Sequence, residues 1–383
     1  MTTIYLVRHA EAEGNLYRRI HGSYNALITD NGFAQIKCLE ERFRDIPVDV
    51  VWSSDLYRTM TTARSVYVPK GLELHTDPQL REVNMGDWED HPWGEIYRTD
   101  PERMYQFNTS SPLWRAPNGD SLAEVGRRIE EAITRIAREN PDKTVAIFCH
   151  GTAIRQFLAN VKGLSAEEWS TLGHSENTAV TCLEYDGEKF AIRFEGDCSH
   201  LPEEITTLGK QKWWKKDGKG RDVNLWYRPI CWETEREIYL NARKEAWIST
   251  HGEQVPFDGE GFRTAAEEHL KRTPWAVTLA MADEEVAGVL ELDVDRYAQD
   301  NAGYIAFCYI VPQRRDQNLG IQLIGQAVSL YRPLGRDKLR LRCAPYNDRA
   351  QYFYRKYGFT KIGDEVGGRV PLEILEKYIG YER

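Results

Sequence analysis

The chain has few features that would stabilise it covalently and no long apolar run. Its seven cysteines are scattered and never form a C-x-x-C pair, so we expect neither a disulfide framework nor a structural zinc site. No apolar stretch approaches the roughly 18 residues that a membrane span needs, and charge appears too early at the N-terminus for a signal peptide. We therefore expect a cytoplasmic protein that has no membrane partner.

Positive charge is also not in excess. Fifty basic residues against 59 acidic ones leave a formal net charge of −9, which argues against a nucleic-acid partner. The hydrophobic fraction of 41% and the charged fraction of 28% are ordinary globular values, so a disordered or collagen-like chain is excluded. At about 150 residues per domain, 383 residues indicate two domains or three.

A change of composition between the two halves marks a domain boundary. The segment after residue 201 is polar, glycine-bearing and rich in lysine, without a sustained period. We expect a first domain at residues 1–201, a linker at 202–221 and a second domain at 222–383. Trp213 and Trp214 of this segment are expected to dock the linker onto a domain rather than to contact a membrane or a nucleic acid.

The first half alternates apolar runs with amphipathic segments. This alternation predicts an α/β fold with a mostly parallel sheet. We expect strands at residues 4–7, 48–52, 144–149 and 179–185, and helices at 29–43 and 121–138. Two of these strands lead directly into a histidine, His9 or His150.

Ligands of open α/β sheets gather outside the carboxyl ends of the strands, and reactive residues follow several strands here. Arg8 and His9 follow the first strand, His150 follows a later one, Arg58 comes shortly after another, and Glu82 lies in a loop. In isolation, such an arginine is usually a helix-end ion pair, and such a glutamate is usually a surface carboxylate. Together these residues indicate a functional site.

The sequence blocks around these residues resemble the histidine phosphatase superfamily, which includes phosphoglycerate mutases and many small-molecule phosphatases. The family's R-H-G-E-T-x-x-N opening corresponds to residues 8–15, and its small polar run before H-L corresponds to residues 197–201. The S-S-x-L-x-R-x-x-x-T-A, L-x-E-x-x-x-G-x-W-E and H-G blocks begin at Ser53, Leu80 and His150. The resemblance implies a phosphoglycerate mutase-like three-layer α/β domain.

Two positions depart from the family pattern. Ala10 replaces the usual glycine and Ala12 the usual threonine. If that glycine supplied an unusual backbone angle, the orientation of His9 would differ here.

The chemistry expected at this site is phosphoryl transfer without a metal. A neutral imidazole attacks phosphorus when its other nitrogen donates a hydrogen bond that fixes the tautomer, so His9 is expected to form a phosphohistidine. Arg8 and Arg58 would bind phosphoryl oxygens, with His150 protonated beside the dianion as a third donor. Glu82 would protonate the leaving alkoxide and then activate water. The resemblance adds substrate contacts from Asn15, His21 and Gly22.

A mutase, or a phosphatase that acts on a phosphohistidine protein, is an alternative for this domain. Its roughly 200 residues, with no obvious long closing insertion, favour hydrolysis of a small phosphate ester. Specificity is expected in residues 84–121, whose aromatic residues would line a pocket or pack a lid.

The second half predicts an α+β domain with several antiparallel strands. We expect strands at residues 276–282, 286–294, 305–311 and 339–343, and helices at 233–249, 319–331 and 348–357. A strand, a basic loop and an amphipathic helix follow one another in residues 310–328. Free N–H groups at such a helix start form a cradle for phosphates.

This region resembles the GNAT acetyltransferase superfamily, over roughly residues 222–383. The V-x-P-x-x-R-x-x-G-x-G loop aligns with residues 311–320, slid by one at the proline, and N-x-x-A-x-x-x-Y-x-x-x-G-F begins at Asn347. The resemblance implies a GNAT-like α+β domain with a mixed sheet that uses acetyl-CoA as co-substrate. The positions expected to bind it are Val311, Arg315, Asn318, Leu319, Gly320, Ile321 and Asn347.

The resemblance also assigns roles within the transfer. Backbone N–H groups from Arg315 to Ile321 would hold the pyrophosphate, and Tyr354 would protonate the CoA thiolate, unless it is a packed helix tyrosine. Asn318 occupies the place of the first loop glycine, and asparagine tolerates left-handed backbone angles better than most residues. Glu291, Asp293 and Asp295 are candidate bases, although alternating acids on a strand more often form a solvated face.

Taken together, the sequence predicts a bifunctional enzyme with a small-molecule phosphate ester and an amine as its substrates. The alternative is a phosphatase or mutase whose second domain binds acetyl-CoA as a non-catalytic regulatory module. The oligomeric state is left open.

Overall fold

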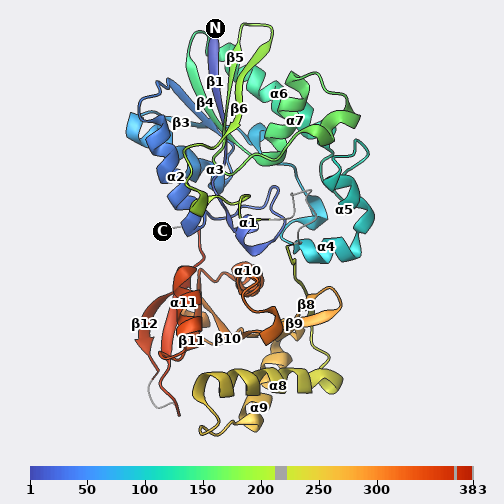
Figure 1. Cartoon of the computed structure of the whole chain (residues 1–383), viewed down its shortest axis with the longest axis vertical. Helices are drawn as coiled ribbons and strands as arrows, with labels where there is room; N and C mark the ends of the chain where they lie inside the picture. The colour runs from blue at the N-terminus through green and yellow to red at the C-terminus, as the bar shows by residue number, and fades with distance from the viewer. Residues whose placement is uncertain (212–221, 366–368, 382–383) are drawn as a thin grey trace. The chain divides into compact units, whose positions relative to one another are not determined.

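The computed structural model describes residues 1–211, 222–365 and 369–381 (Figure 1). They form two compact units, one of Met1–His91 with Ile96–Asp222 and one of Pro92–Glu95 with Val223–Arg383. Trp213 and Trp214 lie outside the described residues. No helix within the described ranges is long and apolar enough to cross a membrane.

The first unit is built on a sheet with the strand order β3-β2-β4-β1-β5-β6. The neighbours β1 and β4, β4 and β2, and β2 and β3 pair in parallel, whereas β5 is antiparallel to β1 and to β6. The predicted mostly parallel sheet is thus confirmed. The strands are β1 (Thr2–Arg8), β2 (Val50–Ser53), β3 (Leu74–Thr76), β4 (Thr144–Cys149), β5 (Val180–Tyr185) and β6 (Phe190–Asp197).

The predicted helices of this unit begin at side-chain caps. Thr29 accepts a hydrogen bond from Gly32 N and so starts the helix that follows it, while Ser121 and Glu124 form a capping box. The helices are α1 (Glu13–Tyr17), α2 (Asp30–Phe43), α3 (Tyr57–Lys70), α5 (Pro101–Asn108), α6 (Leu122–Glu139) and α7 (Gly151–Val161), and α4 (Trp93–Thr99) has residues in both units.

Helices cover both faces of this sheet. Val7, Ala146 and Phe148 pack against Leu39 of α2 and Val66 of α3. Successive side chains of a strand point to opposite faces, so the intervening residues of β1 and β4 face the other side. Helices α6 and α7 contact β1 on that side, and Figure 1 shows the sheet between the two helical layers. The three-layer architecture is therefore as predicted.

Part of the predicted linker belongs to the first unit. The backbone oxygen of Ile205 accepts hydrogen bonds from Asn31 and Gln35, and Thr207 Oγ1 donates to Glu11 at 2.9 Å. The compact unit extends to Asp222. Polar residues after residue 201 thus bond to α2 and to the loop after β1, and the exact domain boundary stays a prediction.

The second unit has a mixed sheet with the strand order β12-β13-β11-β10-β9-β8-β7. Within the described part of the chain, its pairings are antiparallel except that of β10 with β11. The strands are β7 (Trp226–Pro229), β8 (Val277–Ala282), β9 (Glu285–Asp293), β10 (Ala302–Ile310), β11 (Lys338–Cys343), β12 (Thr360–Asp364) and β13 (Glu373–Tyr378). This result confirms the mixed sheet.

Four helices of the second unit are α8 (Trp232–His251), α9 (Gly259–Arg272), α10 (Gly320–Tyr331) and α11 (Asp348–Lys356). Residues of α8 and α9 share a core with β7, β8 and β9, and Figure 1 shows α10 on the other side of the strands. The parallel pairing of β10 with β11 runs only from Ala302 to Ile305. Beyond Ile305, β10 continues to Ile310 without β11 as its partner.

Candidate active sites

The predicted residues of the first unit come together at one edge of the sheet. His9 follows β1, His150 follows β4, and Arg58 lies in the first turn of α3 after β2. Glu82 follows a short 3₁₀ helix after β3. The strands β1 to β4 are parallel, so their carboxyl ends share that edge, and the ring centroids of His9 and His150 are 5.2 Å apart.

The tautomer of His9 is set by its own neighbour. Its Nδ1 lies 2.7 Å from the Ala10 carbonyl oxygen, which can only accept a hydrogen bond. Nδ1 therefore carries the proton, and Nε2 keeps a lone pair. Burial, Arg58 and Arg8 together lower the pKa of His9 well below its ordinary value, so the ring is neutral. Ala10 does not have a positive φ, so the missing glycine does not misorient His9.

Arg58 is held rigidly by the segment that contains Gly22. It is 1% exposed and donates from Nη1 to Tyr24 O at 2.8 Å and from Nη2 to Gly22 O at 2.6 Å. Burial lowers its pKa to about 10, so it remains a cation. A Cβ at Gly22 would collide with the backbone oxygen of Val83. Gly22 therefore contributes through its backbone, by orienting Arg58.

The carboxylate of Glu89 shapes the same segment. It accepts hydrogen bonds from the backbone N–H groups of Gly22, Ser23 and Tyr24, and from that of Met85. No role for Glu89 was predicted from the sequence. The sequence feature that could have identified Glu89 is its place as the final glutamate of the G-x-W-E block.

Among the described site residues, the buried nitrogens Arg8 Nε, His150 Nδ1 and His21 Nδ1 have no hydrogen-bond partner. Arg8 also donates from Nη1 to Ser175 O, and His150 Nε2 lies 2.9 Å from Ser54 Oγ. Burial and Arg58 lower the pKa of His150 well below its ordinary value, so the ring is neutral. The sequence predicts a protonated His150 beside a dianion; without the anion, the surrounding cations disfavour a charged ring.

Glu82 lies at the N-terminus of α7. Its Oε1 accepts from Val83 N and Ala153 N at 3.0 and 3.1 Å, and its Oε2 accepts from Thr152 N at 2.9 Å. These bonds fix the carboxylate between the helix and the site, and they also cap α7. The predicted acid is thus a buried, oriented group rather than a surface carboxylate.

Asn15 and His21 have partners within the protein. Asn15 Oδ1 accepts from Ala12 N at 3.1 Å. The His21 ring stacks on Tyr24 with centroids 4.4 Å apart, and its Nε2 lies 3.2 Å from Asp90 Oδ1. Direct substrate contact by these two side chains stays a prediction.

The predicted pyrophosphate loop of the second unit has left-handed backbone at Asp316 and Asn318, with φ of 62° and 57°. Asn318 thus adopts the conformation that its glycine counterpart would adopt, as expected for asparagine. No side chain of the described residues caps α10, whose N-cap is Leu319. A Cβ at Gly320 would lie 3.0 Å from the Phe353 ring, so this glycine allows α10 to approach α11 closely.

Two predicted cofactor-binding side chains bond to the protein instead. Arg315 donates to Ile310 O at 3.0 Å and to Glu245 Oε2 at 2.6 Å. Asn347 caps α11 by accepting from Ala350 N, and it donates to Thr250 Oγ1 at 3.0 Å. Both residues stand at helix or loop ends, where intramolecular acceptors are near. Direct contact of these two side chains with acetyl-CoA stays a prediction.

Tyr354 is buried beside β10. Its ring packs edge-on against Phe353 and Phe359, and, besides burial, the Cys308 thiol contributes to the raised pKa of its hydroxyl. Cys308 lies in the part of β10 that does not pair with β11. Burial raises the pKa of Tyr354 well above its ordinary value, so the hydroxyl is protonated, as a proton donor must be.

Glu291 was expected on a solvated face, and this expectation is wrong. It is fully buried, pairs with Arg243, and accepts hydrogen bonds from Tyr239 at 2.9 Å and from His269 Nδ1 at 2.8 Å. Arg243 and His269 hold the pKa of Glu291 below its ordinary value despite burial. The carboxylate is committed to this network, which α8 and α9 place over β9.

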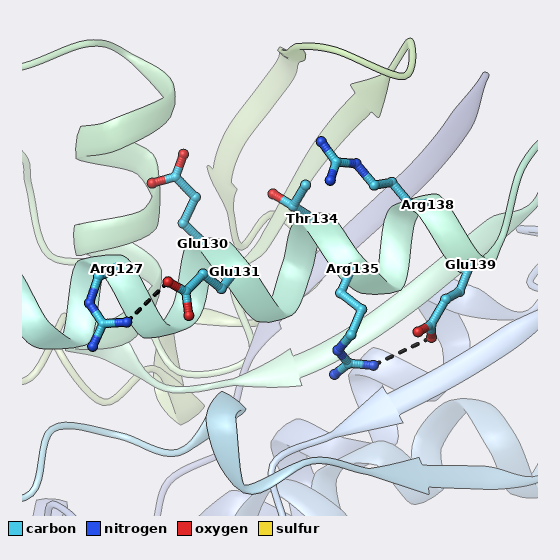
Figure 2. Close-up of a pocket in the computed structure, with 7 residues that line it drawn as sticks. All are labelled: Arg127, Glu130, Glu131, Thr134, Arg135, Arg138 and Glu139. Atoms are coloured by element: carbon cyan, nitrogen blue, oxygen red, sulfur yellow. Dashed lines mark hydrogen bonds and ion pairs between the residues drawn. The ribbon is translucent and has the colours of Figure 1, made fainter.

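A groove on α6 is separate from these residues. Figure 2 shows its seven lining side chains along one helix, with ion pairs that join Arg127 to Glu131 and Arg135 to Glu139. Its volume is ≈ 610 Å³, and its charges are mutually paired or solvated. Among the described residues, no group of three or more His, Cys, Asp or Glu is arranged to hold a metal ion.

Comparison with known families identifies both units. The model of the histidine phosphatase superfamily (branch 1) matches residues 4–197, and that of the acetyltransferase (GNAT) family matches residues 232–359. The chain belongs to the histidine phosphatase superfamily and carries a GNAT acetyltransferase domain in addition.

Individual relatives cover the first half of the chain. A probable phosphoglycerate mutase GpmB of Yersinia pestis (strain Pestoides F) is 31% identical over 206 residues, which are 52% of this chain and 95% of the relative. The structure of YhfR from Bacillus stearothermophilus aligns with 30% identity and a TM-score of 0.51 over 53% of this chain and all of that chain. An alpha-ribazole phosphatase from Shigella flexneri has 22% identity and a TM-score of 0.47, covering 51% of this chain and 96% of that chain.

Proposed function

We propose that the first unit hydrolyses a phosphate monoester through a phosphohistidine on His9. The observation that carries this proposal is the contact of His9 Nδ1 with the Ala10 carbonyl oxygen, which leaves Nε2 free to attack phosphorus. The neighbouring cations Arg8 and Arg58 supply donors for the phosphoryl oxygens. The unpartnered nitrogens of Arg8 and His150 fit an anion that would complete their hydrogen bonding.

The reaction proceeds in two steps. His9 Nε2 forms a bond to phosphorus while the bond from phosphorus to the ester oxygen breaks, and Glu82, in its protonated form, gives its proton to the departing alkoxide. Water then attacks the phosphohistidine, the Glu82 carboxylate takes the water's proton, and the P–N bond breaks to release phosphate and neutral His9. Binding of the dianion would raise the proton affinity of His150, which then donates to an equatorial oxygen.

Mutase activity is the main alternative, because the relative in Yersinia pestis is named a probable phosphoglycerate mutase. We favour hydrolysis because the matched domain contains no long closing insertion that would retain the intermediate. A mutase would need a phospho-donor primer, whereas hydrolysis would not. Turnover of a phosphate monoester with and without such a primer separates the two.

For the second unit we infer acetyl-CoA-dependent acetylation of an amine. The backbone N–H groups at the start of α10 would hold the pyrophosphate, as the left-handed Asn318 and the close approach of Gly320 to Phe353 support. Acetyl-CoA would supply the activated acyl group. Tyr354 would give its proton to the leaving thiolate. A phosphorylated amine or amino sugar would be a substrate for both units, since it carries a phosphate ester and an amine.

The first experiment is hydrolysis of p-nitrophenyl phosphate by the wild type and by His9→Ala, with EDTA present. Hydrolysis that survives EDTA and is lost in His9→Ala supports the phosphohistidine route. His75→Ala is the matched control, because the ring of His75 in β3 packs against that of Trp52 in β2, outside the site. Hydrolysis that persists in His9→Ala would show that another group is the nucleophile.

The second experiment measures thiol release from acetyl-CoA with a panel of amines, including phosphorylated ones. Release that depends on the amine and is reduced about 10- to 100-fold by Tyr354→Phe supports catalysis. Tight binding of CoA without transfer to any amine would favour the regulatory alternative, in which the second unit senses acetyl-CoA.

A further inference from the structure

Thr178 has an unusual backbone conformation next to the nucleophile. Its φ is 60°, and it is fully buried. Among the described residues it is the only β-branched residue with a positive φ. Such residues rarely adopt left-handed angles, because the branched side chain crowds the backbone. The surroundings must therefore hold Thr178 in place.

The left-handed conformation directs the backbone N–H of Thr178 toward Arg8, the last residue of β1, and toward His9, which follows it. Thr178 N donates to Arg8 O at 3.1 Å and, more weakly, to His9 O at 3.4 Å. The preceding residue, Asn177, donates from Nδ2 to His9 O at 2.8 Å. The carbonyl groups of both Arg8 and His9 are thus fixed by the turn, and relaxation of Thr178 would move these donors.

The side chain of Thr178 is held by His200, the histidine of the H-L pair. His200 Nε2 lies 3.1 Å from Thr178 Oγ1, and His200 Nδ1 lies 3.1 Å from Arg42 Nη1. A guanidinium only donates, so Nδ1 accepts and Nε2 carries the proton that is given to Thr178. Asp197 Oδ2 lies 2.7 Å from Arg42 Nη1 and fixes the guanidinium in turn. Burial and Arg42 lower the pKa of His200 to about 4, consistent with this neutral tautomer.

We propose that His200 is a positioning residue for phosphoryl transfer, which holds Thr178 in its left-handed conformation and thereby fixes the backbone of Arg8 and His9. The proposal rests on the proposed function of the first unit. The competing explanation is that His200 only attaches the end of the domain to α2 through Arg42. The two explanations differ in whether the effect of His200 depends on the backbone preference of residue 178.

A double-mutant cycle separates them. Glycine adopts positive φ at no steric cost, so in a Thr178→Gly background the turn no longer needs a side chain to hold it. We expect His200→Leu to lower kcat for p-nitrophenyl phosphate at least about 10-fold in the wild-type background and less than about 2-fold in the Thr178→Gly background. Equal losses in both backgrounds, or no loss in either, would overturn the proposal.

A matched pair of substitutions identifies which hydrogen bond matters. His200→Gln keeps an N–H donor within reach of Thr178, whereas His200→Asn keeps an acceptor for Arg42 but is too short to reach Thr178. We expect His200→Gln to retain most of kcat, and His200→Asn to lower kcat as much as His200→Leu does. Both His200→Gln and His200→Asn should have a urea midpoint closer to that of the wild type than His200→Leu has. The reverse order would show that attachment to Arg42 is the role of His200. If His200→Leu does not fold, His200→Asn replaces it in the cycle.

The same proteins distinguish this proposal from the proposed function. If His9→Ala retains hydrolysis, the proposed nucleophile is wrong. The double-mutant cycle is then repeated with the affinity for orthovanadate, measured by calorimetry, in place of kcat. A loss of vanadate affinity on His200→Leu that disappears in the Thr178→Gly background still supports positioning of the anion site. Equal losses in both backgrounds overturn it, and failure of the wild type to bind vanadate overturns both proposals.

Discussion

The two units build their candidate sites from different parts of the chain. In the first unit the chemistry lies on buried side chains, with His9, Arg58, Glu82 and His150 brought together from separate loops at the sheet edge. In the second unit the predicted phosphate cradle is backbone at the start of α10, and the side chains of Arg315 and Asn347 bond to the protein. A side-chain site fails when one residue is replaced, whereas a backbone site depends on conformation.

This difference also explains how clearly each site was marked in the sequence. Arginine, histidine and glutamate are needed for what their atoms do, so their positions are restricted to one residue type. A backbone cradle accepts any residue that adopts the required angles. Asn318 replaces the glycine of the family pattern and keeps the left-handed conformation. A departure from the family pattern at a backbone position such as Asn318 is therefore tolerated more easily than a departure at a catalytic side chain.

The largest effect is expected from Arg58→Ala. It removes a buried cation that would bind the phosphoryl group, and it releases the backbone of Gly22 and Tyr24. We expect kcat for p-nitrophenyl phosphate to fall about 10²- to 10³-fold. The matched control is Arg64→Ala, since Arg64 is exposed on the same helix, α3. Steady-state kinetics measures both, and similar losses in the two variants would contradict an active-site role for Arg58.

Glu82→Gln should lower the rate about 10²-fold, in a way that depends on the leaving group. An alkoxide needs a proton as it departs, whereas p-nitrophenolate is a stable anion. We therefore expect a larger loss with an alkyl phosphate than with p-nitrophenyl phosphate. Equal losses with both substrates would indicate that Glu82 acts only by capping α7 through Thr152 and Ala153.

The sequence predicted the layers of both units because their buried strands and amphipathic helices are strongly patterned. It missed β3, β6, β7, β12 and β13, all in the outer pairs of the sheets, and in β6 and β12 exposed polar residues interrupt the alternation. The burial of Glu291 was missed because its partners, Arg243 and His269, come from two helices that only the fold brings to β9. The role of Glu89 was not predicted because its carboxylate accepts hydrogen bonds from backbone N–H groups, which every residue except proline carries.

Three histidines of the first unit and His269 of the second unit should respond to pH in opposite directions. In the first unit, burial lowers the pKa values of His9, His150 and His200 below 6.5, so the unfolded chain binds more protons and the free energy of unfolding falls as pH drops below 6.5. In the second unit, the pKa of His269 is raised despite burial because Glu291 and Asp293 stabilise its charged form. That stabilisation is complete below 6.5 and is lost as pH rises through the folded-state pKa.

We expect slopes of up to about 1.4 kcal/mol per pH unit for each fully buried group. Hydrogen exchange resolved by peptide, between pH 5 and 8, measures the two units separately. His269→Gln should remove the change above pH 6.5 in the second unit only. A parallel response of both units across the whole range would contradict the assignment.

Asn318→Ala should lower the affinity for acetyl-CoA about 10-fold, because alanine pays about 1–2 kcal/mol to adopt a left-handed angle. Asn318→Gly should bind at least as well as the wild type, since glycine adopts the same angle freely. Calorimetry with acetyl-CoA measures both variants. If Asn318→Gly loses affinity as much as Asn318→Ala does, the asparagine side chain rather than the backbone contacts the ligand.

The smallest effect is expected from Arg315→Ala, the counterpart of Arg58→Ala in the second unit. Its guanidinium already bonds to Ile310 O and Glu245, so we expect the Kd for acetyl-CoA to rise less than about 3-fold, and the free energy of unfolding to fall by about 1 kcal/mol. Glu245→Gln should reproduce that loss of stability. A loss of affinity above about 10-fold would mean that Arg315 leaves Glu245 to bind phosphate, and that both units rely on side chains after all.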